Sequence, residues 1–185
     1  MSRLYISVGL AFFLWCMCAM LVSCSGSGSP AISTGNAGAG SDGIAVPSAI
    51  ARSQVVKGGK AAMDSMNGSL RAKDGSFVFA ASGLVSCDGW AFDDGRNSTP
   101  RGVWIELTQE ATGRHYYWHA QRYERPALAA AERISSIVNA GFQCDPVGYS
   151  LPPGMYTAQV YQVDGQTAKV SNFTTYTPSP RITVK

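Results

Sequence analysis

Short apolar runs separated by turn signals fill most of the chain after residue 68, and this pattern most constrains the fold. The runs cover 77–81, 84–92, 103–108, 115–119, 142–144, 155–163 and 168–176. Asp74-Gly75, Asp93-Asp94-Gly95 and Asp164-Gly165 lie between runs, and such pairs favour tight turns. Because short strands joined by tight turns are typical of antiparallel sheets, we expect a mainly β domain of about seven strands, packed as a sandwich.

The runs 103–108 and 115–119 form a predicted β-hairpin with two distinct faces. Val103, Ile105 and Leu107 alternate with more polar residues, and a Gly-containing turn at 111–113 precedes the aromatic run. If the apolar set faces the core, period two sends four larger side chains to the opposite face of the sheet. These candidate ligand-binding residues are Trp104, His115, Tyr117 and His119.

This aromatic face has two interpretations. Trp, Tyr and His combine apolar area with a polar group, so the face could stack on sugar rings or contact a protein partner. Alternatively, a helix predicted at 126–138, with Pro126 at its first position and Gly141 after its end, covers the face and makes it a second small core.

Catalytic and metal-binding motifs are not found in the sequence. His115 and His119 would share one face of a helix, but on a strand they are ~13 Å apart, too far to chelate one ion. There is no His-Glu-x-x-His, Gly-x-Ser-x-Gly or Gly-rich phosphate loop. We therefore expect no catalytic residues, metal or cofactor, and a hydrolase is only the third functional hypothesis.

The segment Leu151-Pro152-Pro153-Gly154-Met155-Tyr156 resembles the tyrosine corner of Greek-key sandwiches. The resemblance implies structural roles for Leu151, Gly154 and Tyr156, with the Tyr156 hydroxyl bonded back to the arch backbone. Residues 89–93, 122–131 and 140–142, followed by this corner, are also similar to small sandwich modules of bacterial envelope and glycan-related proteins. The expected fold is an Ig-like, Greek-key antiparallel sandwich with one inserted helix at 126–138, occupying residues 68–185.

The N-terminus indicates where the protein resides. The run Leu4–Val22 is almost wholly apolar, follows Arg3 and ends in Leu21-Val22-Ser23-Cys24, which resembles the lipobox of bacterial lipoprotein precursors. The resemblance implies a signal peptide at 1–23 and lipid on Cys24. Since Ser25 rather than Asp follows the cysteine, the sorting rule of that family favours the outer over the inner membrane. The alternative is an uncleaved transmembrane helix.

A Gly/Ser-rich stretch follows Cys24, and we expect residues 24–67 to act as a flexible tether, with 44–67 either a short helix or more tether. The remaining cysteines then divide simply: two leave with the signal, and Cys87 and Cys144 face an oxidising compartment as a disulfide. The alternative is two buried thiols.

The charge of the chain bears on its partners. A net charge of +3 without basic clusters gives no surface suited to nucleic acid. The leading expectation is a lipid-anchored envelope protein acting as a non-catalytic interaction or scaffolding module for another envelope protein. The alternative is a glycan-binding lipoprotein that uses Trp104 and Tyr117.

Overall fold

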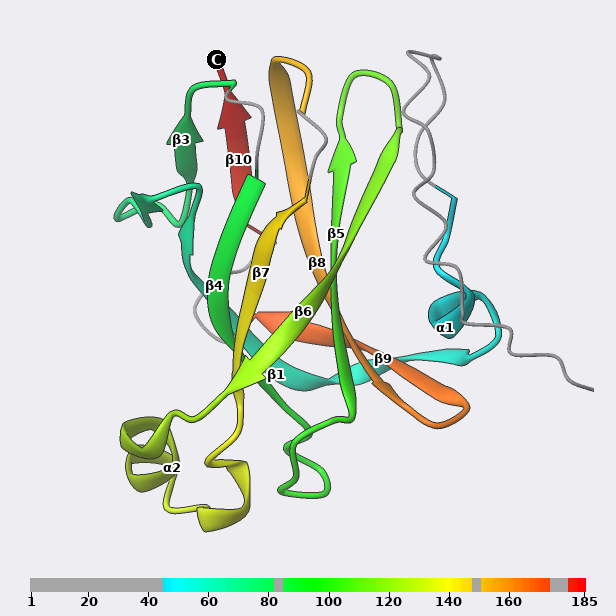
Figure 1. Cartoon of the computed structure of the whole chain (residues 1–185), viewed down its shortest axis with the longest axis vertical. Helices are drawn as coiled ribbons and strands as arrows, with labels where there is room; N and C mark the ends of the chain where they lie inside the picture. Colours follow the sequence, from blue (N-terminus) through cyan, green and yellow to red (C-terminus); the bar gives the residue numbers. More distant parts are fainter. Residues whose placement is uncertain (1–44, 82–84, 148–150, 174–179) are drawn as a thin grey trace, which may run out of the picture. The chain divides into compact units, whose positions relative to one another are not determined.

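The computed structural model describes residues 45–81, 85–147, 151–173 and 180–185. The predicted signal peptide, Cys24 and the tether up to residue 44 lie outside the described residues. The strands are β1 (Gln54–Met66), β2 (Ser69–Leu70), β3 (Phe77–Phe79), β4 (Val85–Phe92), β5 (Gly102–Gln109), β6 (His115–Tyr123), β7 (Gly141–Val147), β8 (Gly154–Asp164), β9 (Thr167–Phe173) and β10 (Arg181–Val184) (Figure 1). The helices are α1 (Ser48–Ala51), α2 (Pro126–Glu132) and the 3-10 turn η1 (Ser135–Ile137).

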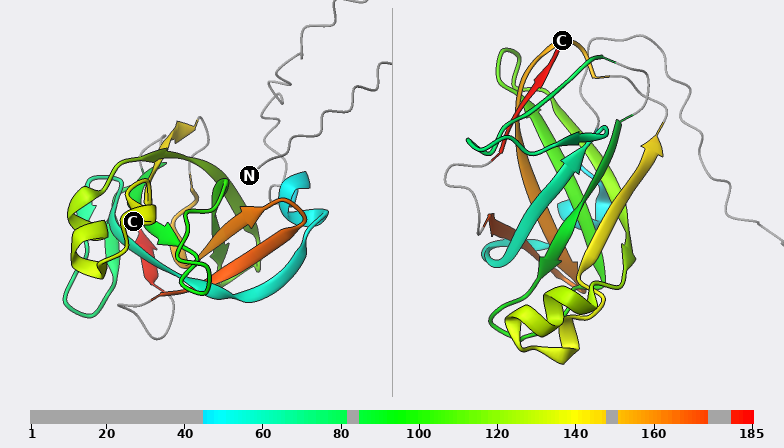
Figure 2. Two further views of the ribbon diagram at one scale, coloured as in Figure 1. Left: turned by 90° about the horizontal axis from the view of Figure 1, so that it is seen from below. Right: turned by 90° about the vertical axis from the view of Figure 1, so that its left-hand side faces the viewer.

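The mainly β prediction is confirmed, but the Ig-like sandwich is wrong, because the sheet closes on itself as a seven-stranded barrel. Strands β1, β4, β7, β6, β5 and β8 are neighbours in that order, and β9 pairs with both β8 and β1. The β9–β1 pair is parallel, with Val55 opposite Ala168 and Lys57 opposite Val170. Figure 2 (left) shows β1 and β9 side by side at this closing seam.

Strand β1 forms one side of the closing β9–β1 pair, and the sequence pattern did not predict it. Its thirteen residues lie in the stretch expected to be tether, so the domain begins before residue 68. The pairing register shifts between Lys57 and Lys60 and again between Met63 and Ser65. Each shift interrupts the alternation of buried and exposed residues, so β1 shows no sustained period of two.

The barrel wall is continued at one end by additional strands. The first residues of β8 pair with β10, whereas its last residues, Tyr161–Asp164, pair with β9. Strand β3 pairs in parallel with β10, and β2 pairs with β1. Strand β8 therefore changes partner along its length, which a long, twisted barrel strand can do.

The barrel interior is filled by inward side chains rather than left hollow. Val103, Ile105 and Leu107 of β5 and Tyr116 and Trp118 of β6 belong to one buried cluster. This is the alternation expected for the hairpin. Large apolar residues from the other strands complete the cluster, including Met63, Met66, Phe77, Phe142, Val160 and Ile182.

The predicted helix at 126–138 is shorter than expected. α2 ends where Arg133 adopts a left-handed conformation (φ +58°), and η1 follows it. Gly141 does not cap a helix but begins β7. Side chains of this segment form a separate small cluster with Phe92 at the end of β4, so the helix does not cover the aromatic face.

Candidate functional site

The predicted aromatic face lies on the outer wall of the barrel, across β5, β6 and β8. In the β5–β6 hairpin, Trp104 is opposite His119, Glu106 opposite Tyr117, and Thr108 opposite His115. On the other side of β5, Trp104 is opposite Tyr161 of β8. The four candidate residues thus do share one surface, and Tyr161 joins them.

A carboxylate is buried at the centre of this face. Only 4% of Glu106 is exposed. Its two oxygens accept hydrogen bonds from the hydroxyls of Tyr117 and Tyr161, each at 2.8 Å, and from Nδ1 of His115 at 2.6 Å. Thr108 Oγ1 is also 3.1 Å from that Nδ1. Because a buried carboxylate is costly unless it is hydrogen-bonded, these donors explain how Glu106 is tolerated.

The two tyrosines are held in their neutral form by this environment. Burial is the main cause that raises the pKa of Tyr117 and of Tyr161, and the hydrogen bond and negative charge of Glu106 raise both further. Neither phenol therefore ionises near neutral pH, although both donate hydrogen bonds to Glu106. The arrangement resembles a structural polar network more than an acid–base pair.

The short helix α1 covers part of the same face. Ile50 forms a buried cluster with Tyr117, Val163 and Ala168, and Trp104 and Tyr161 pack against it. Only 6% of Tyr117 is exposed, so its ring cannot stack on a sugar. The face is thus largely a second small core, under α1 rather than under the helix at 126–138.

The accessible part of the face consists of His115, whose side chain is half exposed, and of the contact between Trp104 and His119. The two rings are in contact at 4.9 Å between centroids, with planes inclined by 57°. Trp104 is partly buried, and the His119 side of the pair is exposed to solvent. The indole of Trp104 packs against the cluster under α1, which holds it in place. The Trp104–His119 pair therefore presents an apolar ring and a polar ring in a fixed position on the rigid barrel wall.

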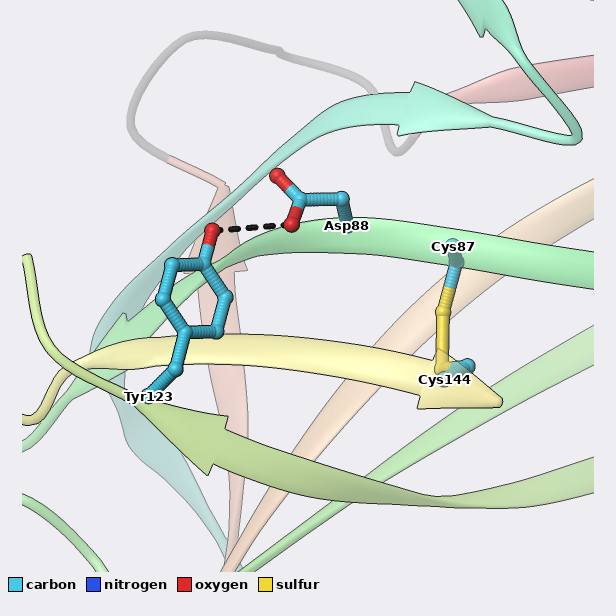
Figure 3. Close-up of a disulfide and its surroundings, with 4 residues drawn as sticks. All are labelled: Cys87, Asp88, Tyr123 and Cys144. Atoms are coloured by element: carbon cyan, nitrogen blue, oxygen red, sulfur yellow. Dashed lines mark hydrogen bonds between the residues drawn. A yellow bond between two sulfur atoms is a disulfide. The ribbon is translucent and has the colours of Figure 1, made fainter.

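A second polar cluster lies around the wall on β1, β4 and β6. The Tyr123 hydroxyl donates to Asp88 at 2.8 Å (Figure 3), and Arg125 pairs with Asp64 at 2.8 Å. Gly141 permits this contact, because a Cβ there would lie within 2.9 Å of the Tyr123 ring and the Arg125 stem. Burial raises the pKa of Tyr123, and the hydrogen bond to Asp88 adds to it. Arg125 also lies 3.8 Å from Asp88, so one guanidinium faces two carboxylates in this cluster.

The predicted disulfide is present in the structure. Cys87 on β4 and Cys144 on β7 are directly opposite each other, with Cα atoms 4.9 Å apart (Figure 3). Both residues belong to the main buried cluster. The bridge joins two neighbouring strands of the barrel.

The corner residues lie at the start of β8. The Tyr156 hydroxyl donates to the Pro152 carbonyl at 2.6 Å, the backward bond that the resemblance implied. Tyr156 and Leu151 are buried, and Gly154 begins the strand. This local turn occurs here in a barrel, so the motif alone did not define a sandwich.

The described residues contain no group of three or more His, Cys, Asp or Glu side chains placed to hold a metal ion. In the same part of the chain, no helix is long and apolar enough to cross a membrane. The sequence pattern did not indicate the central role of Glu106 and Tyr161 in this face. The available signal was a carboxylate in an otherwise aromatic face, opposite Tyr117.

Comparison of the chain with protein-family models, with curated proteins and with solved structures returns no match.

Proposed function

We propose that the protein is a lipid-anchored envelope protein whose barrel is a non-catalytic interaction module for another envelope protein. The observation that carries this proposal is the Trp104–His119 pair, a partly exposed aromatic contact fixed on a rigid wall. Tryptophan is enriched among the residues that dominate binding at protein interfaces, and a preorganised side chain loses little freedom on binding.

The anchoring part of the proposal rests on Leu21-Val22-Ser23-Cys24, and the location it favours is the outer membrane of a bacterial envelope. Lipid on Cys24 would attach the chain to the membrane durably if two or more acyl chains are added. α1 begins at Ser48, so the barrel follows this segment within a short stretch of chain.

The anchor is tested with Cys24→Ser in the full chain. We expect a larger, unprocessed precursor that does not incorporate labelled fatty acid. Cys18→Ser is the matched control, because it also removes a cysteine near the predicted cleavage site and is expected to leave labelling unchanged. Labelling that persists in Cys24→Ser would contradict the lipid anchor.

The second candidate is glycan recognition by the same face, favoured by the partial exposure of Trp104. The burial of Tyr117 leaves a single indole rather than the expected pair of stacking residues. One experiment separates the two functions: retention of the protein on the polysaccharide and protein fractions of the organism's own envelope, with Trp104→Ala in parallel. Met155→Ala, at a 44% exposed residue on the same strand as Tyr161, is the control.

Retention on the protein fraction that Trp104→Ala abolishes would support the interaction module. Retention on polysaccharide that the same variant abolishes would favour glycan recognition instead. Binding that is indifferent to Trp104 but lost in Met155→Ala would contradict both assignments of this face.

A further inference from the structure

An exposed surface with apolar and basic side chains lies where the described part of the chain begins. Figures 1 and 2 show α1 next to the end of the β1–β9 pair. Val46 precedes α1 and Val55 lies at the start of β1, and the two residues are 48% and 50% exposed. Arg52, directly after α1, and Lys57 of β1 are exposed as well. We call this surface, made of Val46, Arg52, Val55 and Lys57, the α1 corner.

The pairing of β1 with β9 fixes the side of the barrel wall on which the corner lies. Val55 is opposite Ala168, which belongs with Ile50 of α1 to the small buried cluster on the outer wall. Lys57 is two residues further along β1, within the same regular stretch of pairing, so it lies on the same face as Val55. The helix and the strand therefore contribute to one outer surface.

The α1 corner is positively charged. Residues 45–63 contain three cations and no Asp or Glu. Within the described part of the chain, neither Arg52 nor Lys57 forms an ion pair. The exposed carboxylate of the neighbouring β8–β9 turn, Asp164, pairs instead with Arg96 and Arg101. A second copy of the chain would bring the same cations to this surface, so the charge favours an anionic partner.

The other exposed large apolar residues have charges of both signs around them. Val78 and Met155 are both opposite Thr183 and are 43% and 44% exposed. Glu110 lies next to Met155, to whose carbonyl its backbone N–H donates, and Asp74 lies in the turn before β3. These acids lie among the cations Arg71, Lys73, Arg181 and Lys185. Because carboxylates are repelled by an anionic surface, the α1 corner, with cations alone, suits such a surface better.

The position of the corner along the chain also places it near the predicted anchor. Residues 25–44 separate Cys24 from the described part of the chain, which starts at the corner. A flexible segment of that length spans about 25 Å, so a barrel anchored at Cys24 is held close to the bilayer surface. A weak attraction is then sufficient for contact, because the tether makes the contact intramolecular.

We propose that the α1 corner docks on the surface of a membrane that contains anionic lipids. Arg52 and Lys57 contact lipid phosphates, and Val46 and Val55 enter the region between headgroups and acyl chains. The proposal rests on the lipid anchor proposed above and adds an orientation of the barrel to it.

Docking at this corner is compatible with the interaction surface proposed above. Lys57, Val170, Tyr161 and Trp104 are successive partners across β1, β9, β8 and β5. Trp104 is therefore three strand spacings, about 14 Å, from Lys57 along the wall. The Trp104–His119 pair lies beside the membrane contact rather than within it.

The test places the lipidated protein in nanodiscs of equimolar phosphatidylglycerol and phosphatidylcholine, with a spin label on some of the lipid headgroups. The label broadens the backbone NMR signals of residues that lie near the bilayer. We expect the broadening to be concentrated at residues 46–57 and to be several-fold weaker at 70–78. In discs of phosphatidylcholine alone, we expect most of the broadening at 46–57 to disappear.

Charge variants identify the groups responsible. Lys57→Glu reverses one exposed charge of the corner and is expected to lower the docking equilibrium constant about tenfold. Lys73→Glu makes the same change at an exposed lysine in the turn between β2 and β3, so it is the matched control and should behave like wild type. Arg52→Glu, outside the strands, is a second variant in case Lys57→Glu disturbs the β1–β9 pair.

Elution of the protein with the discs separates a failure of docking from a failure of the anchor. Protein that elutes with the discs but is broadened uniformly, or mainly at 70–78, overturns the docking and leaves the anchor intact. Equal broadening of 46–57 in both lipid compositions also overturns it, because the cations then play no part. Signals of 46–57 that shift with the number of protein copies per disc would assign the corner to a second copy instead. Protein that does not elute with the discs contradicts the anchor and, with it, this proposal.

Discussion

At the scale of single residues, Glu106 is the common hydrogen-bond acceptor at the centre of the outer aromatic face. Its carboxylate accepts from two buried tyrosine hydroxyls and from His115. Glu106→Ala would leave the two phenols without their acceptor, and we expect the free energy of unfolding to fall by about 2–4 kcal/mol. Glu106→Gln keeps one acceptor oxygen and should lose less. Urea titrations of both variants check this, and equal losses would contradict the role given to the carboxylate.

The hydroxyl of Tyr156 gives a prediction about pH. Burial, with a smaller contribution from Tyr116, raises the pKa of Tyr156 from its usual value near 10 to about 12. Since the folded state holds the proton more tightly than the unfolded state, the stabilisation is complete below pH 10 and is lost between about pH 10 and 12. We expect the unfolding free energy of Tyr156→Phe to fall less steeply than that of wild type over this range.

Lysines also titrate in this window, and the comparison of wild type with Tyr156→Phe removes their shared contribution. Denaturant titrations at a series of pH values from 8 upward provide the measurement. Parallel curves for the two proteins would show that the Tyr156 phenol is not protected by the fold.

At the scale of elements, α1 is a small helix with a specific packing role. It has four residues, and Ile50 is its buried residue, set against Tyr117, Val163 and Ala168. Ile50→Ala should therefore cost about 2 kcal/mol or more of stability and shift the fluorescence of the adjacent Trp104. Val46→Ala, at a 48% exposed position just before the helix, is expected to change neither. An unchanged Ile50→Ala protein would mean that α1 does not cover the face.

Close backbone approach accounts for one glycine in β4. A Cβ on Gly89 would lie 2.2 Å from the Ala62 carbonyl oxygen and 2.6 Å from the Phe142 ring. Gly89→Ala must displace backbone of β1, so we expect a loss of about 3 kcal/mol or more. Gly95→Ala, whose nearest contact would be 3.4 Å, is the control and should remain near wild type in thermal melts. Similar melting of both variants would contradict the β1–β4 register.

At the scale of the whole molecule, local patterns predicted the strands but not their closure. The hairpin parity of Val103 and Trp104 follows from strict alternation, and the Cys87–Cys144 bridge follows from cysteine usage. The pairing of β9 with β1 does not follow from any such pattern, because the register shifts in β1 remove the alternation that marks a strand. A parallel contact between residues as distant as Val55 and Ala168 has no local signal at all.

In the candidate sites, too, some features follow from local sequence patterns and others depend on residues distant in the sequence. Trp104 and His119 were predictable from period two, whereas the burial of Glu106 depends on Tyr161 and α1, elements distant in sequence. Gln162 occupies an inward position two residues from Val160 on β8, but only the meeting of β1, β4 and β8 gives its amide the Lys60 and Phe92 carbonyls to which it donates. Tertiary partners, not local propensity, define both features.

The disulfide is a further whole-molecule feature, because its two cysteines are 57 residues apart. In the chain-entropy model a bridge closing a loop of this length stabilises a fold by about 4 kcal/mol. We expect Cys87→Ala/Cys144→Ala to lose stability of this order in urea titrations. A double variant as stable as wild type would indicate that the barrel alone sets the stability.

Closure of the barrel depends on the pairing of β9 with β1. The most direct measurement is the set of backbone nuclear Overhauser contacts between residues 54–57 and 167–170 of the protein. A closed barrel gives the contact pattern of a parallel pair in the register Val55–Ala168 and Lys57–Val170. If β9 instead shows contacts to β8 alone and the edge of β1 exchanges freely with solvent, the sheet is open and the barrel is contradicted.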